Sequence, residues 1–261
     1  MKERPGERLS AAIRAAAAQG EPAIIAFMTA GYPLREQFRE QLAAIGEAAD
    51  VVEIGVPFTD PMADGVTIQR SSQGALRQGV SLAWILAELR TMTRPRAPLV
   101  LMSYLNPLLA FGFEPLARAA AEAGVSGFIV PDLPYDEGEE LRAALATQGL
   151  ALVQMVTPVT TPERLAKVCA ASEGFVYAVT MTGTTGRNAA SLPDLARYLG
   201  RVRAAARTPV CAGFGIRRRE QVVALRGQAD GVIVGSALVE LLERGEDPVR
   251  WLQGLRGRPA D

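Results

Sequence analysis

The chain has 261 residues, of which 49% are hydrophobic and 21% charged, and its 28 basic and 28 acidic side chains give a formal net charge of zero. This length suits one α/β barrel, the hydrophobic share excludes a disordered chain, and the balanced charge leaves no basic stripe for nucleic acid or an anionic membrane. The sequence has no histidine, which excludes Ser-His and Cys-His nucleophiles and leaves acid–base work to carboxylates, Lys, Tyr or Cys.

The two cysteines, Cys169 and Cys211, lie in different predicted elements and lack the spacing of metal ligands. We interpret them as packing thiols of a protein in the reducing cytoplasm, without a metal site. The first twenty residues are charged and Ala-rich, with no apolar signal core, and no run approaches ~18 apolar residues, so neither a signal peptide nor a membrane span is expected.

Short apolar runs alternate with helical patterns along the chain. The runs predict eight strands, over residues 23–28, 51–56, 98–104, 127–130, 150–156, 175–179, 209–212 and 231–234. The patterns predict helices over 7–19, 35–48, 66–92 (one or two helices), 114–123, 136–147, from 161 onward, 193–205, 218–226, and two after residue 235. Asn106-Pro107 is expected to close the third strand as a loop.

Strands that alternate with helices predict a parallel sheet, and eight such units predict a closed (β/α)8 barrel, or TIM barrel. The alternative is a doubly wound open sheet, but no G-x-G-x-x-G follows the first strand. We find no linker and expect one barrel domain over residues 1–261, with an extra N-terminal helix and a short helix after strand eight. The site of such a barrel lies at the C-terminal ends of its strands.

Glu53 stands inside the otherwise apolar second strand. Strand alternation puts Glu53 on the same face as Val51 and Gly55, which is the interior of a barrel. A structural ion pair is one explanation, but the other strand runs contain no cation. A carboxyl in apolar surroundings has a raised pKa, so the position favours a proton donor or acceptor near neutral pH. Asp60 and Asp64 follow in a Pro/Gly-broken loop, where Asp64 fits a helix cap nearly as well as a functional group.

The ends of the last two strands have the features of an anion site. Gly213-Phe214-Gly215 lets backbone N–H groups approach a ligand, and Gly235-Ser236 opens a short helix whose N-terminus favours negative charge. Barrels commonly bind phosphate in these two loops, although turn glycines would look the same. The Thr/Gly-rich segment 182–186 has the composition of a mobile lid or of an ordinary surface loop. Tyr104 and Tyr177 fit either a pocket or the core.

Together these residues resemble the tryptophan synthase α subunit family over nearly the whole chain. The most specific motif runs from Glu53 to Gly65 (EIGVPFTDPMADG) and is followed by Thr67-Ile68-Gln69; residues 26–33 (AFMTAGYP), 130–134 (VPDLP) and 213–216 (GFGI) support it. The resemblance implies a (β/α)8 fold and a reversible retro-aldol cleavage of indole-3-glycerol phosphate to indole and glyceraldehyde 3-phosphate. It also implies that this chain carries no cofactor.

The resemblance assigns a role to particular residues of this sequence. It implies that Glu53 and Asp64 are catalytic, with Glu53 as the acid/base and Asp64 bonded to the indole N–H. The family's other site positions fall on a ring pocket of Phe27, Met102, Tyr104, Ile129 and Tyr177, on a phosphate site of Gly186, Gly213, Gly215, Gly235 and Ser236, and on a lid threonine, Thr185. The family more often has leucine at the position of Met102.

The family works with a β subunit that carries pyridoxal phosphate and condenses indole with serine, usually in an αββα tetramer. The family's partner interface corresponds to Pro57, Asp60, Pro61, Asn106 and Pro107. Three alternatives remain: a stand-alone lyase, a non-catalytic activator of the β subunit, and another phosphate-binding barrel such as an isomerase or epimerase. The presence of both Glu53 and Asp64 disfavours the activator, and the lack of histidine disfavours a metal-dependent epimerase.

Overall fold

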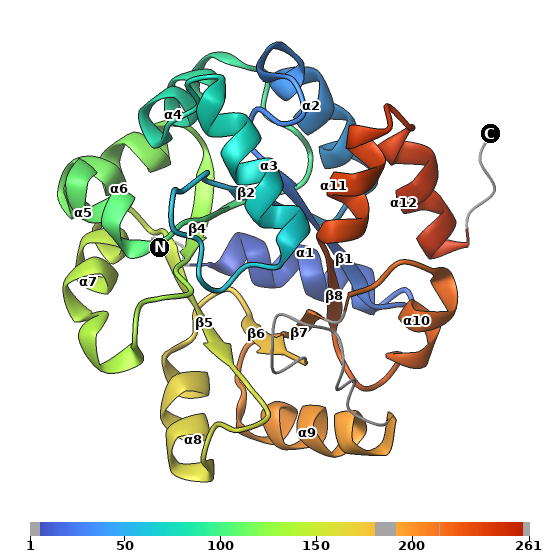
Figure 1. Cartoon of the computed structure of the whole chain (residues 1–261). Coiled ribbons are helices and arrows are strands. Elements are labelled where there is room, and N and C mark those ends of the chain that lie inside the picture. Colours follow the sequence, from blue (N-terminus) through green and yellow to red (C-terminus); the bar gives the residue numbers. More distant parts are fainter. Residues whose placement is uncertain (1–5, 181–191, 214, 258–261) are drawn as a thin grey trace.

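The computed structural model describes residues 6–180, 192–213 and 215–257. In this part of the chain, eight parallel strands close into a barrel in sequence order (Figure 1). They are β1 (Ala23–Thr29), β2 (Val51–Gly55), β3 (Leu99–Met102), β4 (Val125–Ile129), β5 (Ala151–Val156), β6 (Val176–Val179), β7 (Val210–Gly213) and β8 (Gly231–Val234). Because β1 pairs with both β2 and β8, the barrel prediction is confirmed and the open sheet is excluded.

Helices surround the barrel, as the ring of ribbons in Figure 1 shows. Between and after the strands these are η1 (Arg35–Gln37), α2 (Phe38–Ala48), α3 (Val66–Arg77), α4 (Leu82–Thr91), α5 (Leu105–Phe111), α6 (Phe113–Glu122), η2 (Tyr135–Glu137), α7 (Glu139–Thr147), α8 (Pro162–Ala171), α9 (Leu192–Ala205), α10 (Arg219–Ala224), α11 (Ser236–Glu243) and α12 (Pro248–Arg256). The described residues contain no helix long and apolar enough to cross a membrane.

One predicted loop is a helix. Asn106 and Pro107, expected to close the third strand as a loop, lie in the first turn of α5. Proline is tolerated there because the first-turn N–H groups of a helix have no partner within the helix. The backbone N–H of Leu105, which has no acceptor within the helix, donates to the Asp132 carboxylate at 2.9 Å. Leu105 and Asp132 are distant in sequence, so local patterns do not reveal this contact.

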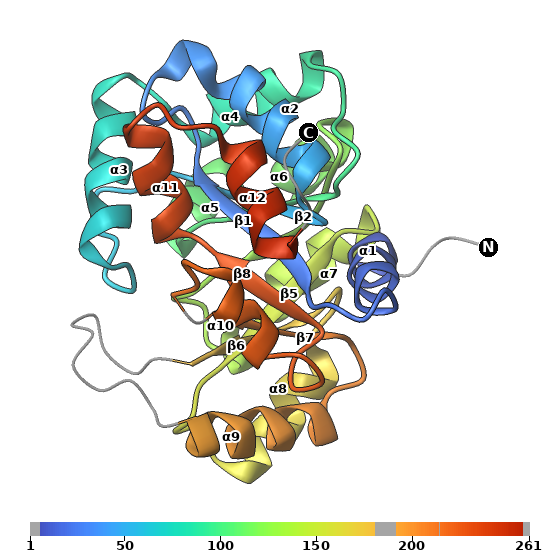
Figure 2. The same cartoon turned by 90° about the vertical axis from the view of Figure 1, so that its right-hand side faces the viewer.

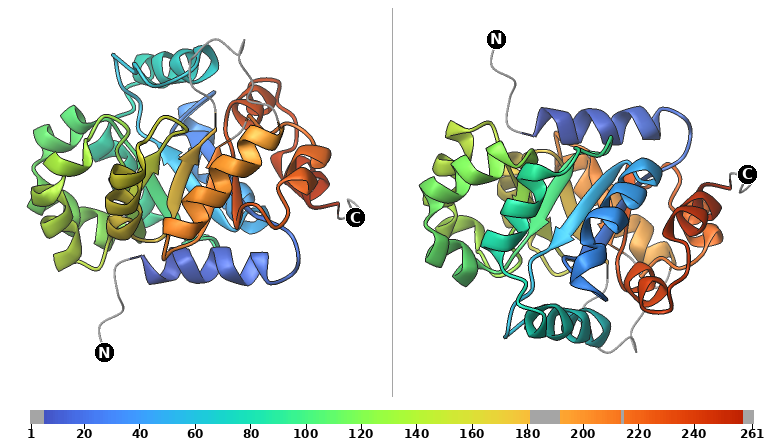
Figure 3. Two further views of the ribbon diagram at one scale, coloured as in Figure 1. Left: turned by 90° about the horizontal axis from the view of Figure 1, so that it is seen from below. Right: turned by 90° about the horizontal axis from the view of Figure 1, so that it is seen from above.

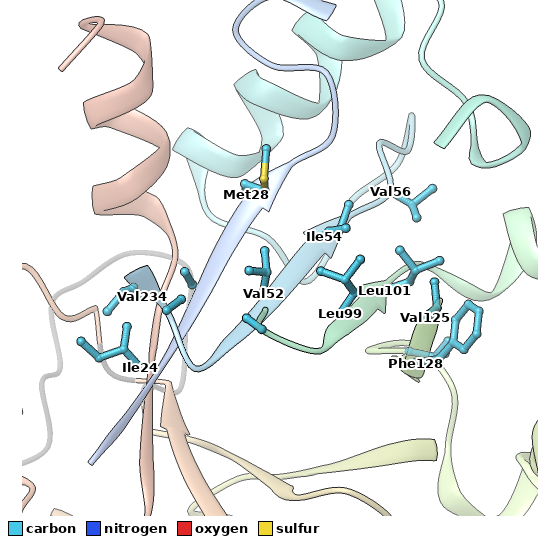
Figure 4. Close-up of a cluster of buried hydrophobic side chains, with 14 of the residues drawn as sticks. Ile24, Met28, Val52, Ile54, Val56, Leu99, Leu101, Val125, Phe128 and Val234 are labelled. Carbon is cyan, nitrogen blue, oxygen red and sulfur yellow. The ribbon is translucent and has the colours of Figure 1, made fainter. Parts of the chain in front are cut away.

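The strands alternate between two apolar layers. Outward residues such as Val52, Ile54 and Leu101 pack in one large cluster between the barrel and its helices, part of which Figure 4 shows. Inward residues such as Val51 and Val100 belong to a separate cluster inside the barrel. This period-two pattern is the one from which the sequence placed Glu53 in the interior.

The opening helix, α1 (Glu7–Ala17), closes one end of the barrel. Leu9 and Ile13 are fully buried and belong to the inner cluster, together with Ala151 and Phe175 near the N-terminal ends of the strands. Figure 2 shows α1 and α3 at opposite ends of the molecule, and both views of Figure 3 show α1 lying across its end of the barrel. α1 therefore covers the apolar cluster of the barrel interior at the N-terminal ends of the strands.

Candidate active site

Glu53 is an inward residue of β2, with only 1% of its surface exposed. Its Oε2 atom is buried and has no hydrogen-bond partner among the described residues. Burial, and to a smaller extent the nearby charge of Asp64, raises the pKa of this carboxyl to about 8. Glu53 is therefore protonated near neutral pH, which is the state of a proton donor.

Asp64 lies in the loop between β2 and α3 and does not cap the helix. The N-cap of α3 is Gly65, which has no side-chain cap bond, so the capping alternative for Asp64 is wrong. The Gln69 amide instead donates to the backbone carbonyl of Asp64 at 2.9 Å. Burial raises the pKa of the Asp64 carboxyl to about 6, although a hydrogen bond from the Tyr104 hydroxyl lowers it.

A cavity of about 200 Å³ brings the two carboxyl groups together with the glycine-rich strand ends. It is lined by Phe27, Glu53, Asp64, Ile68, Met102, Tyr177, Gly213, Gly215, Ile233, Gly235 and Ser236. The carboxyls come from β2 and its loop, and the glycines lie at or just after the ends of β7 and β8, which are on the other side of β1 in the barrel. One cavity thus offers proton-transfer groups at one part of its wall and free backbone N–H groups at another.

The glycine-lined part of the cavity is built around α11. This eight-residue helix begins at Ser236, with Gly235 as its N-cap and no side-chain cap bond, so its first N–H groups are free to bind an anion. At the end of β7, a Cβ on Gly213 would lie 2.8 Å from Cε1 of Tyr177. Glycine at this position therefore allows the Tyr177 ring to pack directly against the backbone.

Three of the five predicted ring-pocket residues line this cavity: Phe27, Met102 and Tyr177. Phe27 packs against Gly55, where a Cβ would lie 2.6 Å from the ring. Ile129 is fully buried in the inner cluster and does not line the cavity.

Tyr104 has a position that the sequence did not indicate. It is only 4% exposed and lines a small neighbouring cavity of about 20 Å³ that also contains Asp64. Its hydroxyl accepts the Ala63 N–H at 2.9 Å and lowers the pKa of the Asp64 carboxyl, and its ring stacks on Phe58 at a centroid distance of 5.1 Å. Tyr104 therefore holds the loop that carries Asp64.

The residues predicted at a partner interface lie in different surroundings. Asp60 and Asn106 are exposed, Pro61 and Pro107 are half-buried, and Pro57 is buried against the small cavity beside Asp64. The predicted lid residue Thr185, the phosphate residue Gly186 and the rest of segment 182–186 lie outside the described residues.

Two isoleucines of the cavity wall were not predicted, Ile68 and Ile233. Ile233 could have been found, because strand alternation places it on the inner face of β8 with Gly231. Ile68 lies in the first turn of α3, and its direction depends on the path of the preceding loop, for which the sequence gives no simple signal.

Larger hollows lie elsewhere but offer no comparable chemistry. One of about 530 Å³ beside α1 contains Asp50 and Glu21, which are paired with Arg256 at 2.5 Å and Arg219 at 3.1 Å. Another of about 710 Å³ lies between α6 and α7. No group of His, Cys, Asp or Glu in the described ranges could hold a metal ion.

A closed parallel barrel with titratable carboxyls and free helix N–H groups at its strand ends is the arrangement of (β/α)8-barrel enzymes. The sequence model of the family "Tryptophan synthase alpha chain" matches residues 13–254. The chain is 45% identical to the tryptophan synthase alpha chain of Nitratidesulfovibrio vulgaris (strain DP4) over 248 residues, which cover 94% of this chain and 96% of that one. The corresponding chain of Deinococcus radiodurans is 42% identical over 243 residues, covering 92% and 90%.

Solved structures agree with this match. A chain of Mycobacterium tuberculosis tryptophan synthase superposes with a TM-score of 0.89 at 37% identity, covering 98% of both chains. Tryptophan synthase subunit alpha from Legionella pneumophila superposes with a TM-score of 0.86 at 31% identity, covering 96% of this chain and 97% of that one. The chain belongs to the tryptophan synthase alpha chain family, whose members are lyases.

Proposed function

We propose that this chain cleaves indole-3-glycerol phosphate to indole and glyceraldehyde 3-phosphate in the cavity that contains Glu53. Membership of the alpha chain family supports the reaction. The assignment of roles depends on one observation: the buried Glu53 carboxyl, whose Oε2 atom has no hydrogen-bond partner within the described part of the chain, lines the same cavity as Asp64 and the N-terminus of α11. In this reading the chain is a lyase subunit of tryptophan biosynthesis.

Glu53 transfers protons in both directions. Its pKa of about 8 keeps the carboxyl protonated at neutral pH, so it can donate a proton to C3 of the indole ring. The resulting carboxylate accepts the proton of the hydroxyl next to the bond to be cleaved. As that oxygen forms a carbonyl, the carbon–carbon bond breaks and its electrons return to the indole ring. Glu53 ends protonated, ready for the next turnover.

Asp64 stabilises the positive charge that protonation places on the ring. With a pKa of about 6, its carboxylate is mostly ionised at neutral pH and can accept a hydrogen bond from the indole N–H. The hydroxyl of Tyr104 orients this carboxylate. Phe27, Met102 and Tyr177 supply the apolar wall of the cavity and are our candidates for contact with the ring.

The phosphate lies at Gly213, Gly215, Gly235 and Ser236 in this proposal. Support comes from the free N–H groups of α11 and from the shared cavity. Gly186 as a further phosphate contact and Thr185 as a lid residue remain expectations from the family. The chemistry needs no cofactor on this chain.

As an alpha chain, the protein is expected to act with a β subunit that carries pyridoxal phosphate and condenses the indole with serine, in an αββα tetramer. Pro57, Asp60, Pro61, Asn106 and Pro107 are our candidates for that interface, and exposure of Asp60 and Asn106 is compatible with it. We place the assembly in the cytoplasm, which is compatible with two unpaired cysteines.

The direct test is to incubate the full chain with indole-3-glycerol phosphate, alone and with a tryptophan synthase β subunit, and to measure indole and tryptophan. We expect slow indole release alone and a faster rate with the β subunit. Dephosphorylated substrate should show a higher KM, because it leaves the α11 N-terminus empty. Absence of both products under both conditions would overturn the proposed reaction, and equal rates with and without the β subunit would favour a stand-alone lyase.

A further inference from the structure

The proposed phosphate site is divided between two segments of the chain. Gly215 follows β7, Ser236 begins α11 after β8, and both residues line the cavity. β7 and β8 are neighbours in the barrel, with Gly213 paired to Ile233, so the two segments lie side by side. A phosphate bonded by both segments requires a fixed spacing between them, because a hydrogen bond weakens steeply when its angle is poor.

One ion pair joins the two segments outside the cavity. Arg217, two residues after Gly215, donates two bonds to the Glu240 carboxylate, at 2.7 and 3.1 Å. Glu240 lies four residues after Ser236, so it is about 6 Å along α11 from the proposed phosphate contact. The Thr67 hydroxyl donates to the same carboxylate at 3.0 Å. The bonds from Arg217 lower the pKa of Glu240, which is therefore ionised at neutral pH. We call Arg217 and Glu240 the β7–α11 clamp.

The backbone beside Arg217 is fixed by other contacts. Gly215 has a φ of 62°, a left-handed conformation that favours glycine, so the chain turns sharply there. The side chain of Ile216 is buried in the cluster between the barrel and its helices. The Gln221 side chain of α10 accepts the backbone N–H groups of Arg217 and Arg218 at 2.8 and 3.1 Å. The Arg217 guanidinium therefore connects α11 to a loop that is itself well anchored.

The clamp contributes geometry rather than stability. The side chains of Arg217 and Glu240 are 54% and 24% exposed, and exposed ion pairs ordinarily add little to the free energy of unfolding. A two-pronged Arg–carboxylate bond nevertheless fixes the relative orientation of its two groups. We propose that the β7–α11 clamp sets the spacing of the two halves of the phosphate site, which makes Arg217 and Glu240 positioning residues for the substrate phosphate. The inference rests on the proposed function and deepens its account of phosphate binding.

The test compares indole-3-glycerol phosphate with its dephosphorylated form as substrates of the full chain. Because a charge-assisted hydrogen bond is ordinarily worth about tenfold or more in affinity, Arg217→Gln should raise KM for the phosphorylated substrate about tenfold. Its kcat, and its KM for the dephosphorylated substrate, should stay near the wild-type values. The Kd of glycerol 3-phosphate, measured by titration calorimetry, should rise by the same factor as KM. A residue that only stabilised the fold would not distinguish the two substrates.

Glu240→Gln separates spacing from charge, because it removes the two-pronged bond together with a negative charge near the phosphate. If the clamp sets the spacing, Glu240→Gln should raise KM as Arg217→Gln does. The double variant Arg217→Gln/Glu240→Gln should then raise KM no further, since paired residues are not additive. A lower KM in Glu240→Gln would show that charge alone matters and would overturn the clamp.

Arg70→Gln is the matched control. Arg70 binds Glu243 of the same helix with two bonds of 2.9 and 2.7 Å, but it comes from α3 and not from the loop after β7. Its loss should leave KM for both substrates unchanged. If Arg217→Gln fails to fold, Arg217→Lys keeps the charge without the two-pronged bond and should raise KM for the phosphorylated substrate by a smaller factor.

The outcomes separate the clamp from the proposed function. An unchanged KM in Arg217→Gln, an equal rise with both substrates, or an equal rise in Arg70→Gln overturns the clamp alone. Equal KM values for the two substrates in the wild type overturn the phosphate site and the clamp together. If the wild type binds glycerol 3-phosphate without cleaving either substrate, and Arg217→Gln weakens that binding, the clamp holds and the proposed reaction fails.

Discussion

The two ends of the barrel are built from opposite kinds of side chain. At the N-terminal ends of the strands, Leu9 and Ile13 of α1 are fully buried in an apolar cluster. Toward the C-terminal ends, the interior contains Glu53, which has a raised pKa and an oxygen without a hydrogen-bond partner among the residues described, and this arrangement costs stability. The comparison suggests a division of labour: one end stabilises the fold, and the other tolerates unfavourable burial for chemistry.

The largest effect should follow from Glu53→Gln, which keeps the shape of the side chain and removes its proton transfer. Since a positioned acid/base contributes about 10²- to 10⁴-fold, indole release should fall by about three orders of magnitude. Glu173→Gln is the control, because that half-buried carboxyl accepts the Leu152 N–H at 2.9 Å outside the cavity. Equal rates for wild type and Glu53→Gln would refute the catalytic role.

The Glu53→Gln variant also tests how the burial of Glu53 affects the free energy of unfolding. Its folded pKa of about 8 lies above the ordinary value of 4.5, so the folded state binds this proton more tightly than the unfolded state. The stability that the protonated group contributes is present below the unfolded pKa and is lost as pH rises through the folded one. Urea unfolding at about pH 5 and about pH 9 should therefore show a smaller loss of stability in Glu53→Gln than in the wild type.

At the end of the barrel that α1 covers, Ile13→Ala should lower the free energy of unfolding and leave kcat unchanged. Truncation of a fully buried isoleucine leaves a cavity and typically costs about 3 kcal/mol in the free energy of unfolding. Ile13→Val should cost about 1 kcal/mol. Denaturant unfolding measures both, and kcat well below the melting temperature should stay near the wild-type value. A fall in kcat comparable to that of Glu53→Gln would contradict the division between the two ends.

Asp64→Asn should reduce indole release by about 100-fold, because a neutral amide cannot stabilise the developing ring charge as a carboxylate does. The dependence of kcat/KM on pH provides an independent test of the role of Asp64. The charge of Asp64 helps to raise the pKa of Glu53, so its removal should move the alkaline limb of kcat/KM to lower pH. An alkaline limb that stays in place would show that the two carboxyls do not interact.

The smallest effect is expected from Tyr104→Phe, which leaves the ring stack and removes one hydroxyl. The Ala63 N–H loses its acceptor, which loosens the loop that carries Asp64, so kcat should fall about fivefold, as for the loss of one hydrogen bond. Because the Tyr104 hydroxyl lowers the pKa of Asp64, the acid limb of the profile should move to higher pH. Tyr135→Phe, outside the cavity, should change neither. A higher KM with unchanged kcat would instead indicate a ring contact.

The barrel and the place of Glu53 could be predicted because both depend on short-range patterns. Alternating apolar runs gave the eight strands, and the period of two placed Glu53 inside. Gly235-Ser236 marked the start of α11 for a similar local reason.

Other features depend on contacts between distant segments. The sequence alone left Asp64 between a cap and a functional group, and only the family resemblance favoured the second. The sequence alone left Tyr104 between the pocket and the core, and the family resemblance placed it in the ring pocket. Its bond with Ala63 could not be predicted, because the path of residues 57–65 has no local signal. The helix that contains Asn106 and Pro107 depends on Asp132, 27 residues away from Leu105.

The helix α1 completes an apolar cluster that fills the barrel interior. Inward side chains such as Val51 and Val100 pack in this cluster together with Leu9 and Ile13 of α1. Because the cluster occupies the barrel axis, a product released beside Glu53 has no route toward the N-terminal ends of the strands. Its escape is confined to the rim, where the proposed partner would receive it. The apolar end of the barrel, which takes no part in the proposed reaction, thus limits the direction in which the product can leave.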